Sequence, residues 1–387
     1  MSNLNNPRLK ALSLASWYPN EDHPLSGIFV KRHVQAVSKY CDICVLYVHM
    51  SQHRKKLSVE STIEDGIKTI RVYNAASKSF FLKGLFGAIK YYYSCLKGLE
   101  VVKKEFGKPD IIHAHVIRQA GILALILNVF TGIPYVLTEH SSQFRDHYSS
   151  NFYKLLCLKI MQRARKILPV SHSLEIQMRD LYHEKKYLVV PNVVDTTVFI
   201  PNHISKNQRS IKKILHVSLL NDEHKNVTGI IKAINELLNI RTDFEMHIIG
   251  DGPDRLELEN LASDLKLLNR YIFFQGRVDD KTMKNLMQNS NFFVLNSRFE
   301  TFAIVCTEAL SAGMPVISTR CGGPEEYITN ESGILIEPGN NGELVNAINY
   351  MLDNSSKYDP EKLHKYIEDR FSYDAVGLML YTIYRSV

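Results

Sequence analysis

The chain has 387 residues, of which 45% are hydrophobic and 22% charged. These are values of a globular protein, and the length favours two domains over one core. No run approaches the ~20 apolar residues of a membrane-spanning helix, and we recognise no signal peptide, so we expect a cytoplasmic protein. Residues 1–199 hold 27 Lys and Arg against 15 Asp and Glu, a net charge of +12. Residues 200–387 hold 20 against 25, a net charge of −5, which indicates two domains with different partners.

The cysteines are scattered along the chain. Cys41 and Cys44 have the C-x-x-C spacing, but no second pair and no histidine cluster in the sequence completes a zinc site. We therefore expect buried thiols in a reducing compartment, no bound metal and no cofactor.

The first predicted strand covers residues 12–16, and the loop after it leads to a helix predicted over residues 28–37. Gly27, at the mouth of that helix, would let the backbone approach a ligand closely. A plain turn glycine is an equal alternative. No Gly-x-Gly-x-x-Gly is present, which excludes the dinucleotide fingerprint.

Residues 78–104 interleave aromatic and aliphatic side chains with lysines. Such a segment suits a membrane interface, where rings lie among the lipid headgroups and ammonium groups meet anionic lipid. The alternative is a domain helix with a buried apolar side and a solvated basic side. A second basic segment, residues 154–166, favours the membrane. We therefore expect peripheral contact with an anionic membrane at its inner face, and no nucleic-acid partner.

Two further strands end in histidines. Residues 109–115 predict a strand whose His113 and His115 we expect to point to opposite faces, and residues 133–139 predict a strand followed by His140. Strand ends at one edge of a parallel sheet converge on one cleft, which raises the odds of a functional role. Strands are also predicted at 166–171 and 188–190, and a polar linker at 202–210.

The second half repeats the pattern of strands and helices. Strands are predicted at 213–218, 245–249, 271–278 and 291–295, and helices at 227–238 and 301–312. Gly313 ends the last helix, and residues 316–318 form the next strand. The start of the 301–312 helix suits an anion such as a phosphate.

Two carboxylates bracket that helix start. Glu300 precedes the helix, and Glu308 is expected about two turns into it. A carboxylate accepts well from a pair of sugar hydroxyls. A ligand with a diphosphate in its middle and a hydroxylated ring at each end, that is, a nucleotide sugar, fits this arrangement.

These two glutamates, the sequence Gly-Met-Pro-Val-Ile at 313–317 and Gly-Gly-Pro-Glu-Glu at 322–326 resemble the donor site of retaining GT-B glycosyltransferases of family 4. The resemblance implies an α/β fold of two Rossmann-like domains that face each other across a cleft. It implies an acceptor domain at 1–200, a donor domain at 201–370 and a C-terminal helix at 371–387 that crosses back to the first domain.

The resemblance also implies roles for residues. Glu300 would face the transferred sugar, Glu308 would hold the ribose, Lys225 would bind the diphosphate and His140 would lie near the sugar; we name Glu300, His140 and Lys225 as catalytic. Further donor contacts are expected at Thr301, Phe302, Ala303, Gly250, Gly252, Arg277, Val278 and Ser218, and cleft contacts at Gly27 and His115.

One position departs from the family. Leu219 stands where an Arg is normal, and Arg298 and Arg320 are both candidates to replace it. Because no Asp-x-Asp is present, we expect metal-independent transfer, with Lys225 and the helix start meeting the diphosphate.

The reaction implied is retaining transfer of a sugar to an acceptor hydroxyl, by attack on the face that the nucleotide leaves. The acceptor would be a glycan or lipid-linked glycan, a precursor of a polysaccharide. The alternatives are an epimerase-like or hydrolase-like GT-B enzyme and a weakly active sugar-nucleotide binding protein. The base and the sugar stay open.

Overall fold

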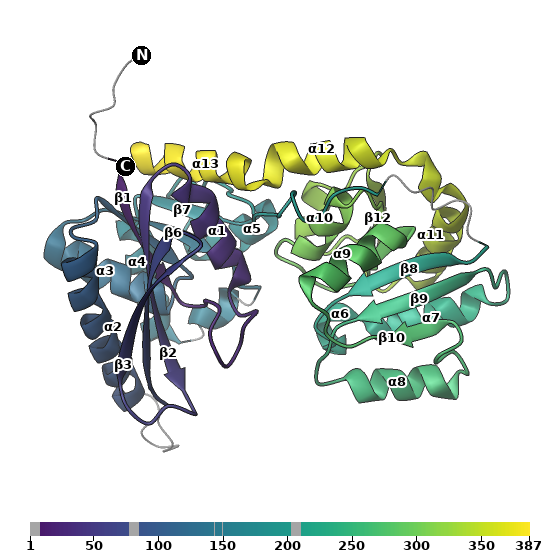
Figure 1. The fold of residues 1–387 in the computed structure, drawn as a ribbon, viewed down its shortest axis with the longest axis horizontal. Coiled ribbons are helices and arrows are strands. Elements are labelled where there is room, and N and C mark those ends of the chain that lie inside the picture. The colour runs from purple at the N-terminus through teal and green to yellow at the C-terminus, as the bar shows by residue number, and fades with distance from the viewer. Residues whose placement is uncertain (1–7, 77–84, 143, 149, 203–209) are drawn as a thin grey trace, which may run out of the picture. The chain divides into compact units, whose positions relative to one another are not determined.

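The computed structural model describes residues 8–76, 85–142, 144–148, 150–202 and 210–387. The start of the predicted membrane segment, residues 78–84, and most of the predicted linker lie outside these ranges. The chain divides into two compact units, residues 1–193 with 373–387, and residues 194–372. Each is an α/β unit built around one mainly parallel sheet (Figure 1).

The first unit has a seven-stranded sheet in the order β3-β4-β2-β1-β5-β6-β7. All neighbouring strands run parallel except β3 and β4, which form an antiparallel pair. Its strands are β1 (Lys10–Ala15), β2 (Asp42–Ser51), β3 (Ser58–Glu64), β4 (Ile67–Ala75), β5 (Ile111–His115), β6 (Tyr135–Glu139) and β7 (Lys166–Pro169). Its helices are α1 (Ile28–Ser38), α2 (Leu85–Glu105), α3 (Gln119–Thr131), α4 (Asn151–Arg163), α5 (His172–Leu181) and α13 (Tyr373–Arg385).

The C-terminal helix α13 packs on α1, as the sequence predicts for a helix that returns to the first domain. Val376 and Leu380 of α13 are buried in one cluster with Val30 and Val34 of α1. A Cβ on Gly377 would lie 2.2 Å from the carbonyl oxygen of Ala36, so glycine is what lets the two helix backbones come this close.

The second unit has a six-stranded, wholly parallel sheet in the order β10-β9-β8-β11-β12-β13. Its strands are β8 (Lys212–Val217), β9 (Phe244–Ile249), β10 (Ile272–Phe274), β11 (Phe292–Leu295), β12 (Val316–Thr319) and β13 (Gly333–Ile336). Its helices are α6 (Asp222–Lys225), α7 (Val227–Leu237), α8 (Arg255–Asp264), α9 (Asp280–Asn289), α10 (Ile304–Ser311), α11 (Asn341–Asn354) and α12 (Pro360–Phe371).

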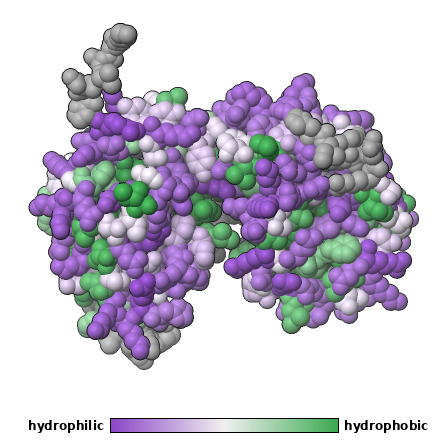
Figure 2. All heavy atoms as spheres, viewed as in Figure 1, coloured by the Kyte–Doolittle hydropathy of each residue, from purple (hydrophilic) through white to green (hydrophobic). Residues whose placement is uncertain are grey.

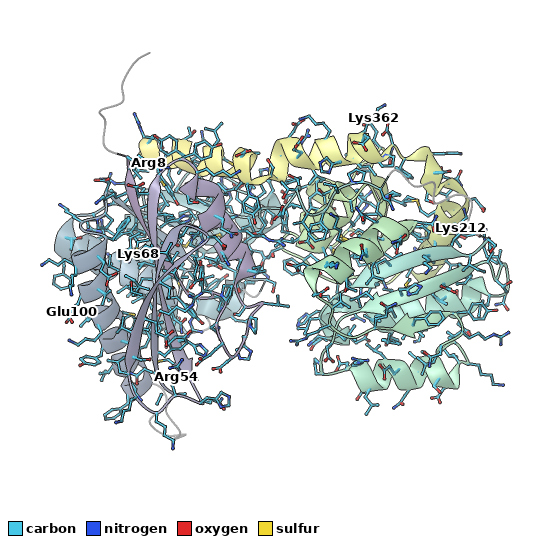
Figure 3. The ribbon with its side chains drawn as sticks, in the orientation of Figure 1. Arg8, Arg54, Lys68, Glu100, Lys212 and Lys362 are labelled. Atoms are coloured by element: carbon cyan, nitrogen blue, oxygen red, sulfur yellow. The ribbon has the colours of Figure 1, made fainter. Side chains whose placement is uncertain are left out.

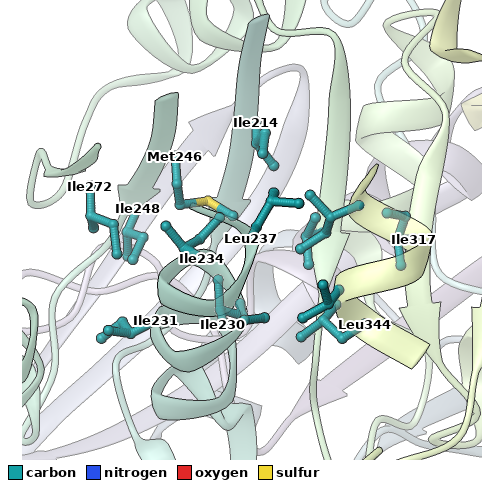
Figure 4. Packing of buried hydrophobic residues seen from close by; sticks show 14 of the residues in the cluster. Ile214, Ile230, Ile231, Ile234, Leu237, Met246, Ile248, Ile272, Ile317 and Leu344 are labelled. Carbon is teal, nitrogen blue, oxygen red and sulfur yellow. The ribbon is translucent and has the colours of Figure 1, made fainter. Parts of the chain in front are cut away.

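The core of the second unit lies between its sheet and the helices that cover it (Figure 4). Ile230, Ile234 and Leu237 recur at helical spacing along α7, and they pack on Met246 and Ile248 of β9. All five side chains are fully buried, and each contributes roughly 1.5–3 kcal/mol to folding. Charged side chains such as Arg54 of the first unit and Lys362 of the second lie at the surface (Figure 3).

Most predicted elements are present, but residues 188–190 do not form a strand. Tyr187 makes a single bridge to Ile167, and the amides of Leu188 and Val190 donate to the β7 backbone. β7 itself ends at Pro169, the acceptor of the Val190 amide, so the pairing stops there. The strand predicted over residues 271–278 is also shorter than expected, because β10 ends at Phe274.

The six cysteines are buried thiols, as predicted, and none of them forms a disulfide. Burial raises the pKa of the Cys41 and Cys44 thiols to about 12, so their C-x-x-C spacing makes no reactive pair.

Candidate functional site

The carboxyl ends of the parallel strands of the second unit meet at one edge of the sheet, where the backbones of three loops lie in contact. A Cβ on Gly250 would lie 1.9 Å from the carbonyl oxygen of Ser218, and one on Gly252 would lie 2.3 Å from that of Leu220. The Gly250 amide donates to the carbonyl of Gly276. Gly250 and Gly252 were predicted to lie close to a ligand. The structure shows that glycine is needed at both positions because the protein's own backbone lies against them.

Lys225 and Glu300, 75 residues apart in sequence, form an ion pair at this edge. The Lys225 Nζ lies 2.5 Å from Glu300 Oε1, and the Ser297 hydroxyl donates to the same oxygen at 2.7 Å. Their side chains are only 23% and 13% exposed. Glu300 therefore holds the Lys225 ammonium group in position before any anion binds to it.

The helix between the two glutamates begins later than predicted. It starts at Ile304 rather than at residue 301, because Ala303 adopts a left-handed conformation with φ 59°. The buried Tyr327 hydroxyl lies 2.6 Å from the carbonyl oxygen of Phe302 and 3.0 Å from that of Ala303, and it holds this turn. Glu308 therefore lies little more than one turn into α10, not two.

The loop after β12 packs closely on the segment that contains Glu300. The Glu300 amide donates to the carbonyl of Cys321, and the Gly323 amide donates to the carbonyl of Glu300. A Cβ on Gly323 would lie 2.5 Å from the carbonyl oxygen of Thr301. The close approach of Gly323 thus holds the backbone of the segment that contains Thr301, Phe302 and Ala303.

Arg298 and Arg320, the two candidates to replace the arginine expected at position 219, both have partners within the protein. Leu219 is itself 56% exposed. The Arg298 guanidinium donates to the carbonyls of Asp222 and Glu223 in the short helix that carries Lys225. Arg320 pairs with Glu337 at 3.1 Å. Arg298 thus supports the Lys225 loop, and Arg320 is held by a carboxylate.

No pattern in the sequence singled out His216, which lies beneath this edge. It is fully buried, its Nδ1–H donates to the carbonyl of Val294, and its Nε2 accepts from the Ser218 hydroxyl. Burial lowers the pKa of His216 to about 4, so the ring is neutral at pH 7. The Ser218 hydroxyl therefore donates its proton in a hydrogen bond to the His216 ring. Arg277 and Val278, the other predicted contacts, follow β10, with Arg277 exposed.

In the first unit, Gly27 caps the N-terminus of α1 in the left-handed region with φ 64°. A Cβ there would lie 2.3 Å from the carbonyl of Trp17. The chain's own packing therefore explains this glycine without a ligand.

His113 and His115 do not point to opposite faces as predicted. Their ring centroids are 3.9 Å apart, because residues two apart on a strand lie on the same face. His113 contacts the Tyr384 hydroxyl of α13 and that of Thr138. The nitrogens His115 Nδ1 and His140 Nε2 are 3.3 Å apart.

His33, from the middle of α1, joins this group, and no signal in the sequence reveals it. Its ring centroid lies 5.2 Å from that of His140 and 5.9 Å from that of His115. Burial lowers the pKa of all three histidines, so the rings are neutral. Next to them, the buried Glu139 accepts from the amides of Ile117, His140 and Ser141.

Comparison with known proteins assigns both units to glycosyltransferases. Residues 52–198 match the family model Glycosyltransferase Family 4, and residues 202–370 match Glycosyl transferases group 1. A phosphatidylinositol N-acetylglucosaminyltransferase subunit of Homo sapiens is 26% identical over 87% of this chain and 73% of its own. N-acetyl-alpha-D-glucosaminyl L-malate synthase of Bacillus anthracis is 27% identical over 71% of each chain.

Solved structures show the same fold. Sucrose-phosphate synthase from Thermosynechococcus elongatus covers 98% of this chain and 99% of its own with a TM-score of 0.78 and 18% identity. Anabaena HepE, in complex with UDP and glucose, covers 98% and 100% with a TM-score of 0.74 and 19% identity. With both units matched, the chain belongs to the glycosyltransferases, in family 4 with the GT-B fold.

Proposed function

We propose that this glycosyltransferase moves a sugar from a nucleotide diphosphate sugar to an acceptor hydroxyl, with retention at the anomeric carbon. The observation that carries the proposal is the Lys225–Glu300 ion pair beside the start of α10. The cation and the helix N-terminus suit a diphosphate, and the neighbouring carboxylate suits the hydroxyls of the sugar joined to it. One similar structure, that of Anabaena HepE, is a complex with UDP-glucose, which supports this donor class.

In the proposed reaction the bond between the anomeric carbon and the diphosphate oxygen breaks, and the acceptor oxygen takes its place on the same face. The acceptor proton passes to the departing phosphate oxygen. Lys225 and the first amides of α10 stabilise the charge that develops on the leaving group, without a metal ion at the diphosphate. The resemblance places His140 near the transferred sugar, and this role stays a prediction. His140 is only 6% exposed, which does not support a contact with the sugar.

A nucleotide-release assay tests the proposal. Release from a matching donor should require an acceptor, and Lys225→Ala should raise the donor KM and lower kcat, because the cation acts in the ground and transition states alike. The rate should be the same with or without Mg²⁺ or Mn²⁺. Lys281→Ala, an exposed lysine on α9, is the matched control. Acceptor-independent release would favour a hydrolase, and no release with any donor would favour a binding protein.

The two glutamates should divide the donor between them. We expect Glu308→Ala to weaken binding of the free nucleotide diphosphate about tenfold to a hundredfold, since charged hydrogen bonds contribute roughly 1.5–3 kcal/mol. Glu300→Ala should leave that binding nearly normal and remove most turnover. Calorimetric titration of both variants decides the matter, and an equal loss of nucleotide affinity would contradict the assignment.

For the acceptor, we propose a lipid-linked or polysaccharide precursor reached at an anionic membrane surface. No helix in the described part of the chain has the length and apolar character needed to cross a bilayer. The connections β4-α2-β5, β5-α3-β6 and β6-α4-β7 all cross the sheet in one direction, so the three helices cover one face.

That helical face exposes apolar side chains from all three helices. We call it the α2–α4 face; its exposed apolar residues are Phe86, Ile89, Tyr93 and Leu96 of α2, Ile126, Val129 and Phe130 of α3, and Phe152, Tyr153 and Leu155 of α4. Exposed Lys154 and Lys159 lie among them. Hydrophobic side chains also reach the surface in the view of Figure 2. Apolar groups beside cations suit an anionic lipid surface, and the human relative is named for phosphatidylinositol.

A further inference from the structure

The second unit has a pocket at the amino edge of its sheet, away from the carboxyl edge where Lys225 and Glu300 meet. Its volume is about 340 Å³, near the lower end of the roughly 300–1,000 Å³ of small-molecule sites. Its walls are the loop 329–332 before β13, the end of α11, and the connection from α11 into α12. Strands β12 and β13 are four residues long, so about 13 Å of sheet separates the two edges.

Three tyrosines line this pocket, which we call the tyrosine pocket. Tyr350 lies near the end of α11, Tyr358 precedes α12 and Tyr366 lies within it. Tyr350 is 48% exposed, and the other two are half-buried. Burial raises the pKa of Tyr358 and Tyr366, so both hydroxyls are protonated at pH 7. Each side chain therefore offers an apolar ring face together with a hydroxyl that can donate and accept.

The polar groups of the tyrosine pocket are available to a ligand. Within the described part of the chain, the three tyrosine hydroxyls have no hydrogen-bond partner, and the ammonium groups of Lys357 and Lys362 form no ion pair. By contrast, Lys365 of α12, which does not line the pocket, pairs with Glu368 and Asp369. A ligand could therefore bind these groups without breaking contacts within the protein.

The loop that forms one wall has a fixed shape before any ligand binds. The Thr329 amide donates to the Ser332 hydroxyl at 2.9 Å, and the Gly333 amide donates to the Thr329 carbonyl at 2.8 Å. A Cβ on Gly333 would lie 1.9 Å from the carbonyl oxygen of Val316, so the loop is held close to β12. A preformed wall spares the ligand the free energy of ordering it.

The charges around the tyrosine pocket balance. Two lysines, Lys357 and Lys362, and two carboxylates, Glu331 and Asp359, line it. A phosphate or nucleotide site requires an excess of cations, which is not found here. A neutral sugar suits the pocket, because its hydroxyls can accept from ammonium groups and donate to carboxylates, while its C–H face can pack on a tyrosine ring.

We propose that the tyrosine pocket is a second sugar-binding site, which holds a neutral oligosaccharide and transfers nothing. The Tyr350 and Tyr358 rings contact the C–H faces of the sugar, and Glu331 and Lys362 bind its hydroxyls. A glycan held here stays attached to the enzyme between transfers, which raises its effective concentration. That use rests on the proposed transferase function, whereas the binding itself does not.

The test presents the full-length protein to an array of neutral oligosaccharides built from hexoses, 6-deoxyhexoses and N-acetylhexosamines. Hexagalacturonate and heparin fragments serve as anionic counterparts. We expect a neutral oligosaccharide to give the strongest signal, and calorimetry then measures its affinity. No binding of any neutral oligosaccharide, or stronger binding of the anionic ones, would overturn the proposal.

Variants then locate the binding. Tyr350→Ala should weaken binding of that oligosaccharide about tenfold, and Tyr350→Phe, which keeps the ring, should weaken it less. Tyr93→Ala is the matched control, because Tyr93 is 51% exposed on the first unit, and it should leave the affinity unchanged. Melting curves check that each variant folds.

Two outcomes of these titrations would contradict the assignment. Equal affinity in the wild type and Tyr350→Ala would remove the tyrosine pocket as the site. Loss of affinity in Glu300→Ala would place the oligosaccharide at the reaction site instead. Because binding is measured without a nucleotide sugar, failure here is distinct from failure of the proposed transferase reaction, which the nucleotide-release assay reports.

Discussion

The carboxyl edges of the two sheets are held together by different means. In the second unit the loops meet backbone to backbone, at Gly250, Gly252 and Gly323, and one ion pair joins Lys225 to Glu300. In the first unit one glycine, Gly27, makes such a contact with Trp17, but the ends of β5 and β6 are held by side chains, chiefly the buried histidines and Glu139.

This difference explains why the second unit is easier to interpret from its sequence. Where a backbone lies against another backbone, only glycine fits, so the residue type itself signals the contact. Where side chains from separate elements meet, many residue types could fill the space, and no short motif records the meeting. The contrast predicts different responses to substitution in the two units.

The largest effect is expected for Gly250→Ala. The new Cβ would lie 1.9 Å from the Ser218 carbonyl oxygen, at a φ of +131° that L-residues rarely adopt. We expect the free energy of unfolding to fall by roughly 4 kcal/mol, at the top of the range for single substitutions. Urea unfolding followed by circular dichroism measures the loss, while the fluorescence of Trp17, the single tryptophan, reports the first unit.

Gly66→Ala in the first unit is the matched control. Gly66 also has positive φ, but no atom of the described residues lies within 4 Å of the position its Cβ would take. Only the unfavourable backbone conformation should therefore destabilise the variant, by about 1–2 kcal/mol. Equal losses in the two variants would show that backbone approach does not distinguish the units.

Next in size is the coupling between Lys225 and Glu300. Glu300→Gln removes the charge that holds Lys225, and we expect turnover to fall about a hundredfold, as when a positioned charge is lost from a reaction site. The double variant with Lys225→Ala should be much less impaired than the product of the two single losses, because the residues contact one another. Initial rates for the four proteins give the coupling, and strictly multiplicative losses would refute a shared role.

A third prediction concerns acid stability of the second unit. The pKa of buried His216 is lowered to about 4 from 6.5, so between these values the unfolded chain binds a proton that the folded unit does not. Stability is therefore fully present above pH 6.5 and falls as the pH drops towards 4, by about 2 kcal/mol between pH 7 and pH 5. His216→Gln should be less stable at pH 7 but should show a shallower pH dependence in urea unfolding. An unchanged slope would assign the acid sensitivity to other groups.

The smallest effect tests the α2–α4 face of the first unit. Phe130 is 83% exposed, and Phe130→Ser should weaken sedimentation with anionic liposomes about tenfold, the low end of the roughly 1.5–3 kcal/mol that burial of one aromatic side chain contributes. Binding should also weaken with salt, which screens the lysines.

Leu256→Ser is the control for that experiment, because Leu256 is 69% exposed on the second unit. It should leave liposome binding unchanged. Equal losses from the two units, or no binding of the wild type at low salt, would favour a soluble acceptor.

The sequence by itself determined the parts of this protein that depend on local chemistry. Apolar runs predicted the strands, Gly313 marked the end of α10, and the glutamate spacing with Gly-Gly-Pro indicated a glycosyltransferase, a family now shown by comparison. Each signal lies within a few residues of the feature it predicts, and helices and strands follow such local periodicity.

The tertiary structure alone decided the rest. The Tyr327 hydroxyl, 24 residues beyond Ala303, holds the turn that delays α10, and His33 meets His115 and His140 only when α1 lies over the sheet. Exposure of the α2–α4 face likewise depends on which side of each helix the sheet covers. Contacts between residues distant in sequence are fixed by packing, and a pattern read along one chain does not contain them.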